Sequence, residues 1–231
     1  AGGGTGMSPW HMMNEWGVPT LYIASLTYNY VHKLASKGQY VPDIILAGGF
    51  AFEDDIFKAM ALGAPYVKAV GMARSPLCAA HVGKLIAEQI NKNAIDKTIE
   101  PYGRTMDEVF VLASRTKRLF SSNGKEVPAG ALGVYSYYQR LSQGLRQLMC
   151  GSRKFALEHL TRNDIVTLTR EAAEVTGIRY IMDADSEEAE QILSGKEKTK
   201  AKTVVKSMTK QKPKPKVTPK SKAKPKGKAK K

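Results

Sequence analysis

The sequence predicts an α/β fold that holds the C-terminal portion of a TIM (β/α)8 barrel, about its last two strands and their loops. Two apolar segments, residues 43–49 and 66–71, end in glycine, and each precedes a stretch with helical periodicity. Gly48 and Gly71 lie 23 residues apart, which is the repeat expected of consecutive β/α units. We therefore expect the two strands to be adjacent in a parallel sheet.

A loop and two helices are predicted before the first strand. Residues 1–9 contain four glycines within six positions, which excludes regular structure and suits backbone wrapped closely round a ligand. A short helix is predicted over residues 10–16 and a second over residues 26–37. The apolar face of the second helix carries Leu26, Tyr30 and Leu34.

Each strand is followed by a predicted helix. The first covers residues 53–62, faces the sheet with Ile56, Phe57 and Met60, and ends at Gly63 as a left-handed C-terminal residue. The second covers residues 76–91. Its inward face is predicted to carry Val82, Leu85, Ile86 and Ile90.

Beyond residue 95 the β/α repeat ends and a helical extension is predicted. Helices are expected over residues 104–120, 132–149 and 186–193. Another is expected after Thr161, where Asp164 completes a capping box and Gly177 is the stop signal. Its buried stripe is predicted to carry Ile165, Leu168, Ala172 and Val175. We divide the chain into a barrel part (1–95), a helical extension (96–195) and a disordered basic tail (196–231).

The positive charge of the chain is confined to the tail. The net charge is +15, and residues 196–231 hold 16 of the 36 basic residues but one of the 21 acidic ones. The remaining residues are therefore neutral overall. Lysine-rich, aromatic-free tails bind DNA through its phosphates, so nucleic-acid binding through the tail is an alternative function, with a solvated, incidental tail as the plainer interpretation.

Composition also limits the compartment and the class of protein. Cys78 and Cys150 are the only cysteines, which fits a reducing cytoplasm better than a disulfide scaffold. No apolar run reaches the length of a membrane span. The chain begins at Ala1 within a glycine-rich run, and we interpret it as a fragment or a processed chain.

The glycines at the strand ends are the strongest functional signal. Without a Cβ atom, Gly48, Gly49 and Gly71 let backbone N–H groups approach a phosphate. In β/α barrels the loops after strands seven and eight often form such a site. We expect these two loops to converge on one anion.

Four motifs, in this order, resemble the FMN domain of glutamate synthase. Residues 2–9 are similar to its substrate-side loop, residues 43–49 to its phosphate-binding strand, and residues 59–64 and 71–76 to the segments that follow. Residues 144–149 and 160–165 resemble the C-terminal extension of stand-alone, archaeal-type members. The resemblance covers roughly residues 1–190, and the first loop distinguishes this family from other FMN barrels.

The resemblance implies a cofactor, a reaction and site residues. FMN would reduce the imine formed from 2-oxoglutarate and glutamine-derived ammonia to L-glutamate. Backbone N–H groups of Gly48, Gly49, Gly71 and Met72 would bind the FMN phosphate, with a charge-assisted contact from Arg74. The substrate face would be lined by Gly3, Gly4, Thr5 and Ser8. The catalytic residues are not assigned.

The chain departs from the bacterial family pattern in two respects. Family members of that type carry three closely spaced cysteines for an iron–sulfur cluster, whereas this region has Cys78 alone, so no cluster is expected from this segment. A separate electron donor, ferredoxin or an NAD(P)H reductase, and a separate amidotransferase are the implied partners. Two strands cannot close a barrel, and we do not expect this chain to be active alone.

Other interpretations of these residues remain open. The barrel could belong to another FMN enzyme, such as a 2-hydroxy-acid oxidase, or to an inactive remnant. Cys78 and His81 could share a metal, but two ligands make no zinc site, so we interpret them as a buried thiol and a packed histidine. Glu53, Asp54 and Asp55 could act as acid–base carboxylates, but their position favours stabilisation of a helix N-terminus.

Overall fold

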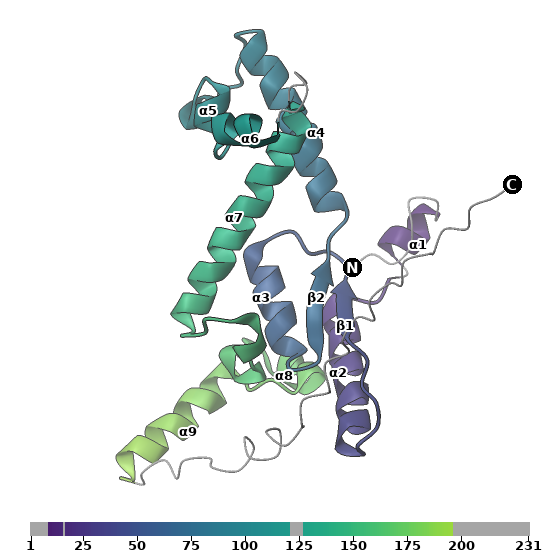
Figure 1. Ribbon diagram of the computed structural model, residues 1–231. Helices are drawn as coiled ribbons and strands as arrows, with labels where there is room; N and C mark the ends of the chain where they lie inside the picture. The colour runs from purple at the N-terminus through teal and green to yellow at the C-terminus, as the bar shows by residue number, and fades with distance from the viewer. Residues whose placement is uncertain (1–8, 16, 121–126, 196–231) are drawn as a thin grey trace, which may run out of the picture. The chain divides into compact units, whose positions relative to one another are not determined.

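The computed structural model describes residues 9–15, 17–120 and 127–195. Contacts between Cα atoms divide the chain into two units, Ala1–Asp185 and Ser186–Lys231. The first unit is helix-rich and contains a small parallel sheet (Figure 1). The glycine-rich loop at residues 1–8 and the basic tail lie outside the described residues, so their predictions stay predictions.

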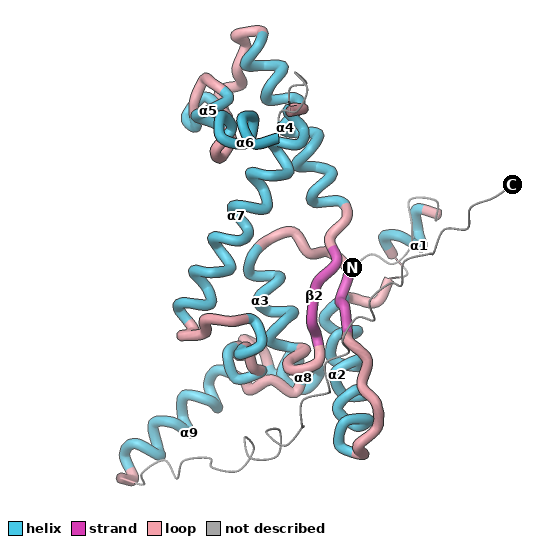
Figure 2. Tube along the Cα trace, in the orientation of Figure 1, coloured by secondary structure: helices cyan, strands magenta, loops and turns pink. Residues whose placement is uncertain are grey.

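The sheet pairs two parallel strands, as predicted. Strand β1 (Ile44–Ala47) is connected to β2 (Val67–Gly71) through helix α3 (Glu53–Leu62). Ala47 lies opposite Gly71 in the register, so both strands end at the same edge of the sheet. Figure 2 shows the loops that leave the two strands at this edge.

Helix α3 covers one face of this sheet. Phe57, Met60 and Leu62 of α3 pack with Leu46 and Val67 of the strands in one buried cluster. On the other face of β1, Ile45 is 65% exposed. The alternation follows from the period of two along a strand, which sends successive side chains to opposite faces.

Helix α2 (Thr20–Ser36) begins earlier than predicted and buries a different face. A short helix α1 (Trp10–Asn14) precedes it. Leu26 and Tyr30 of the predicted stripe are 67% and 66% exposed, so the prediction is wrong for these two. Ala24, Ser25 and Val31 are buried instead, because α2 contacts α3 and α8 through this side of the helix.

Gly63 ends α3, but its backbone is not left-handed as predicted. Its φ angle is −91°, which any residue adopts. A Cβ atom at this position would lie 2.0 Å from Cγ2 of Val67. Glycine is therefore required at position 63, because any side chain there would overlap Val67 at the start of β2.

Helices α4 (Arg74–Asn91) and α7 (Ala129–Gly151) pack against each other through small residues. A Cβ atom on Gly133 would lie 2.4 Å from the Ala79 carbonyl oxygen, and one on Gly83 would lie 2.9 Å from Cα of Gly133. The predicted inward face of α4 is wrong for Val82 and Leu85, which are 49% and 43% exposed. The close contact buries Gly83 and Ala87 instead.

The helix predicted over residues 104–120 is broken into α5 (Met106–Val109) and α6 (Ala113–Phe120). Leu112, between them, has a φ angle of +52°. The Asp107 carboxylate accepts hydrogen bonds from the backbone N–H and the hydroxyl of Ser114, at 2.7 and 2.5 Å. These bonds lower the pKa of Asp107 and compensate donors that the break leaves free of a helical partner.

The capping box at Thr161 forms, but the turn that it caps is short. The Asp164 carboxylate accepts from the Thr161 N–H at 2.7 Å, and the turn is the 3-10 helix η3 (Arg162–Asp164). Helix α8 (Arg170–Thr176) starts separately after Thr169, so Ile165 and Leu168 precede it. Gly177 ends α8 with a φ of +66°, as predicted.

The remaining elements are short or terminal. Two further 3-10 turns are η1 (Glu100–Tyr102) and η2 (Leu157–His159). Helix α9 (Ile181–Leu193) contains the predicted segment 186–193 and begins five residues before it. Thr167 and Tyr180 form an isolated parallel bridge on either side of α8.

Arg162 joins the C-terminal segment to the sheet unit. Its guanidinium donates to the carbonyls of Leu62, at 2.6 Å, and of Thr176, the last residues of α3 and α8. It also lies 3.8 Å from the centroid of the Tyr28 ring. A cation is stabilised at the C-terminal end of a helix, and here one cation serves two helices.

Replacing Arg162 should destabilise the chain strongly. Arg162→Met leaves two helix-end carbonyls without their charged donor, and we expect a loss of about 2–4 kcal/mol in the free energy of unfolding. Arg162→Lys keeps the charge but not the forked geometry and should be intermediate. Urea unfolding followed by circular dichroism measures both variants.

Arg170→Met is the matched control. Arg170 also lies over a tyrosine ring and pairs with Asp183 at 3.3 Å, but its side chain is 70% exposed. Its replacement should cost less than about 1 kcal/mol. Equal losses for Met at positions 162 and 170 would contradict the role given to Arg162.

Candidate functional site

The predicted phosphate residues lie at the carboxyl edge of the sheet. Gly48 and Gly49 follow β1 with φ angles of +134° and +77°, a region of backbone space that favours glycine. No atom lies within 4 Å of the position that a Cβ atom on Gly49 would take. At Gly71, a Cβ atom would lie 3.1 Å from that of Ala47. The backbone at Gly49 therefore faces open space.

Arg74 begins α4 at the same edge. Ala73, the residue before it, provides no side-chain cap to the helix, so the first N–H groups of α4 retain their partial positive charge. Arg74 is exposed, and within the described part of the chain its side chain has no hydrogen-bond or ion-pair partner. A helix N-terminus with an adjacent guanidinium suits an anion.

Three hydroxyl groups bond the carbonyls of the loop that follows β1. Each comes from a different helix and spans a long stretch of sequence. Thr20 of α2 donates to Gly48 at 2.8 Å, Ser75 of α4 to Phe50 at 2.9 Å, and Tyr137 of α7 to Ala51 at 2.6 Å. The loop is thus held by residues on both sides of it in sequence.

Asp55 bonds the N–H groups of the same loop. Its carboxylate accepts from Ala51 and Phe52, each at 3.1 Å. Asp54 instead pairs with Lys58 on the surface at 2.6 Å, and this contact lowers the pKa of Asp54. The acidic first turn of α3 is therefore structural, as predicted, with no sign of an acid–base pair.

The other residues singled out in the sequence differ in where they lie. Met72 is half-buried and packs against the main core cluster, so its backbone alone is available at the strand end. Cys78 and His81 are both exposed, so the predicted buried thiol and packed histidine are wrong. The substrate-side residues Gly3, Gly4, Thr5 and Ser8 fall outside the described residues.

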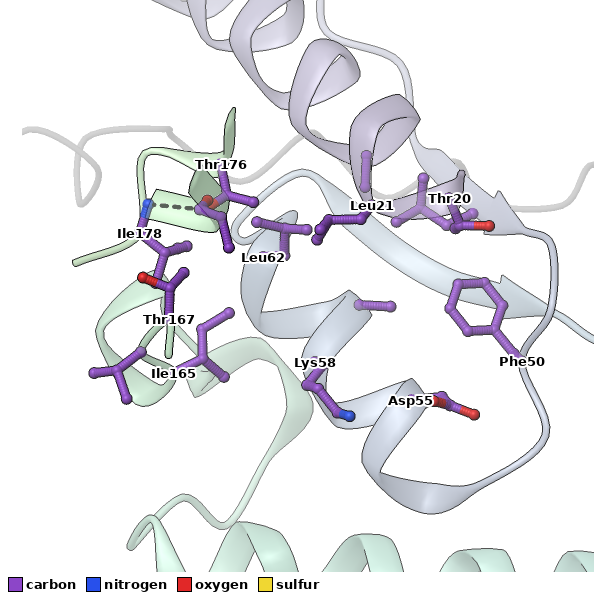
Figure 3. Close-up of a pocket in the computed structure, with 15 residues that line it drawn as sticks. Thr20, Leu21, Phe50, Asp55, Lys58, Leu62, Ile165, Thr167, Thr176 and Ile178 are labelled. Atoms are coloured by element: carbon purple, nitrogen blue, oxygen red, sulfur yellow. Dashed lines mark hydrogen bonds between the residues drawn. The ribbon is translucent and has the colours of Figure 1, made fainter. Parts of the chain in front are cut away.

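An apolar cavity of about 450 Å³ lies beside the loop that follows β1, with Phe50 in its lining. Figure 3 shows it between α2, α3 and the segment at residues 165–178. Its walls are mostly aliphatic, and the hydroxyls of Thr20 and Thr176 already donate to carbonyls. None of the predicted phosphate residues lines it. Its chemistry does not suit an anion.

Comparison with known proteins supports the resemblance found in the sequence over residues 1–86 and leaves its later part untested. Residues 1–86 match the conserved region in glutamate synthase. The match is consistent with a member of the glutamate synthase family, whose activity is that of an oxidoreductase and whose members generally bind FMN. No curated protein and no solved structure matches the chain.

The match to the glutamate synthase region includes Gly48, Gly49, Gly71 and Arg74, together with Thr20. It ends inside α4, before α7 begins. Thr20, Ser75 and Tyr137 were missed by sequence reasoning, because lone hydroxyl residues carry no motif and their partners are distant backbone atoms. Asp55 had a usable signal in its position at the first turn of a helix.

Among the residues that the structure describes, no group of three or more His, Cys, Asp or Glu side chains is placed to hold a metal ion. Within the same residues, no helix has both the length and the apolar character that crossing a membrane requires.

Removing the Asp55 carboxylate should loosen the loop. Asp55→Ala leaves the N–H groups of Ala51 and Phe52 without their charged acceptor, and we expect a loss of about 1–3 kcal/mol in unfolding free energy. Asp54→Ala, next to it, removes an exposed ion pair and should cost less than about 1 kcal/mol. Chemical denaturation of both variants tests this difference, and equal losses would contradict it.

Proposed function

We propose that this chain is part of an FMN-dependent glutamate synthase and binds the phosphate of FMN at the carboxyl edge of its sheet. The observation that carries the proposal is the parallel register of Ala47 with Gly71, in a region that matches glutamate synthase. It brings the loop at Gly48-Gly49 and the start of α4 to one edge. In this proposal β1 and β2 are the last two strands of a (β/α)8 barrel, and Ile45 faces its interior.

The residues present fit a phosphate group. The open space beside Gly49 allows an anion to approach the backbone closely. Arg74 and the uncapped N-terminus of α4 provide positive charge without a competing carboxylate partner in the described residues. Gly48, Gly71 and Met72 complete the proposed set through their backbone N–H groups.

The protein's contribution to the reaction is binding and orientation. FMN, when bound and reduced, supplies the hydride that converts the imine of 2-oxoglutarate and ammonia into L-glutamate. Gly3, Gly4, Thr5 and Ser8 are proposed to line the substrate side. Electrons would come from a separate donor protein, because Cys78 alone cannot hold a cluster. Ammonia would come from a separate amidotransferase.

Loss of the Arg74 guanidinium should weaken FMN binding through its phosphate. We expect Arg74→Gln to raise the Kd for FMN by about tenfold, as for a lost charge-assisted hydrogen bond. The 31P resonance of FMN, titrated with the full chain, measures this affinity. Arg104→Gln, which removes an exposed guanidinium from the extension, is the control and should leave it unchanged.

The outcomes of this titration are decisive for the binding proposal. Riboflavin, which lacks the phosphate, should bind more weakly than FMN. Equal affinity for riboflavin and FMN, or no change with Arg74→Gln, would overturn the proposed phosphate site. Oxidation of reduced FMN that requires both glutamine and 2-oxoglutarate, with the rest of the proposed barrel, the donor and the amidotransferase present, distinguishes glutamate synthase from a 2-hydroxy-acid oxidase.

The tail supports a second candidate function, binding to nucleic acid. Its 16 lysines and single glutamate contrast with the neutral remainder of the chain. Contacts with about six phosphates would weaken duplex DNA binding roughly 1,000-fold between about 50 and 200 mM salt. Filter binding should show this dependence for the full chain and no binding after removal of residues 196–231. Affinity that survives the removal would contradict the charge argument.

A further inference from the structure

Tyr137 links helix α7 to the loop that follows β1, residues 48–52. Its hydroxyl donates to the Ala51 carbonyl at 2.6 Å, across 86 residues of sequence. Burial raises the pKa of this phenol, the neighbouring Ser75 hydroxyl opposes the effect, and the nearby Asp55 and Glu53 charges add to it. The phenol therefore stays protonated, and able to donate, throughout the physiological pH range.

The peptide groups of the loop are bonded at both ends. In a planar trans peptide, the carbonyl of one residue and the N–H of the next point in opposite directions. Between Phe50 and Ala51, the carbonyl accepts from Ser75 and the N–H donates to Asp55. Between Ala51 and Phe52, Tyr137 and Asp55 play the same two roles.

This arrangement confines the freedom of the loop to Gly49. Thr20 bonds the Gly48 carbonyl and so orients the N–H of Gly49, which belongs to the same peptide group. The next peptide group, between Gly49 and Phe50, has no such bond in the described structure and lies beside open space. A loop held on both sides of one glycine is organised before a ligand arrives, which lowers the cost of binding.

We propose that Tyr137 is a positioning residue of the phosphate site, which makes helix α7 of the extension part of the FMN-binding machinery. The proposal rests on the proposed function and extends it beyond the matched residues 1–86. Tyr137 does not contact the ligand in this proposal. It acts through the Ala51 peptide and, with Ser75 and Asp55, keeps the loop in its binding conformation.

The test compares two hydroxyl deletions in the full chain. Tyr137→Phe removes the bond to Ala51 and leaves the ring, so α7 keeps its packing. Thr176→Val is the matched control, because the Thr176 hydroxyl also donates to a carbonyl, that of Ala172, at 2.6 Å, away from the loop. Titrations with FMN and with inorganic phosphate, followed by 31P resonance, are combined with thermal unfolding of each variant.

We expect Tyr137→Phe to raise the Kd for FMN and for phosphate by about three- to tenfold. Thr176→Val should leave both affinities unchanged although its loss in melting temperature is at least as large, because the Thr176 hydroxyl also accepts from the N–H of Ile178. Ser75→Ala should weaken phosphate binding as Tyr137→Phe does, and Ser75→Thr should restore it.

Each outcome bears on one proposal. If the unaltered chain binds FMN and Tyr137→Phe binds it with the same affinity, the role proposed for Tyr137 is overturned and the proposed function is not. Equal weakening in Thr176→Val would show that Tyr137 acts only through general stability and would overturn it too. Absence of FMN and phosphate binding in the unaltered chain would instead overturn the proposed function.

Discussion

The parallel pairing of β1 with β2 is the constraint on which the site depends. Parallel strands need a crossover, and α3 provides it while covering one face of the pair. The pairing places Ala47 opposite Gly71, so the loop after β1 and the helix after β2 begin at the same edge. A shift of one residue in this register would send Leu46 to the exposed face and separate the two glycine ends.

The helices after residue 95 complete this unit. Arg162 bonds the C-terminal ends of α3 and α8, and α7 packs on α4 through glycine contacts too close for any side chain. Tyr137 then reaches the loop from α7. The sheet alone buries little apolar surface, since a two-stranded pair is marginal in water, and the extension supplies much of the missing burial.

The sequence was sufficient for features set by local rules. Both strands and α3 were predicted to within two residues at each end, because apolar runs, glycine ends and an acidic first turn all agree there. The break at Leu112 was missed because it depends on a bond between Asp107 and Ser114. The buried face of α4 was misassigned because Gly133 admits a closer approach at Gly83 than any leucine would, and hydrophobicity alone does not reveal such contacts.

The loop that follows β1, residues 48–52, shows the same difference between features set by local sequence and features set by distant contacts. The sequence was sufficient to place Gly48, Gly49 and Gly71 at the strand ends and Arg74 after the second of them, and their part in binding phosphate stays a proposal. The bonds to the loop were not predicted, because they join side chains to main-chain atoms up to 86 positions away; for Asp55 only its place in the first turn of α3 was predicted.

The region that matches glutamate synthase does not end at a boundary between structural units. The match ends at residue 86, within α4, yet Gly83 of that helix packs against Gly133. A chain cut there would lose half of a helix interface, the Tyr137 bond to Ala51 and the Arg162 contact with Leu62. Because each of these contacts joins the extension to the residues that match glutamate synthase, the two parts belong to one compact unit.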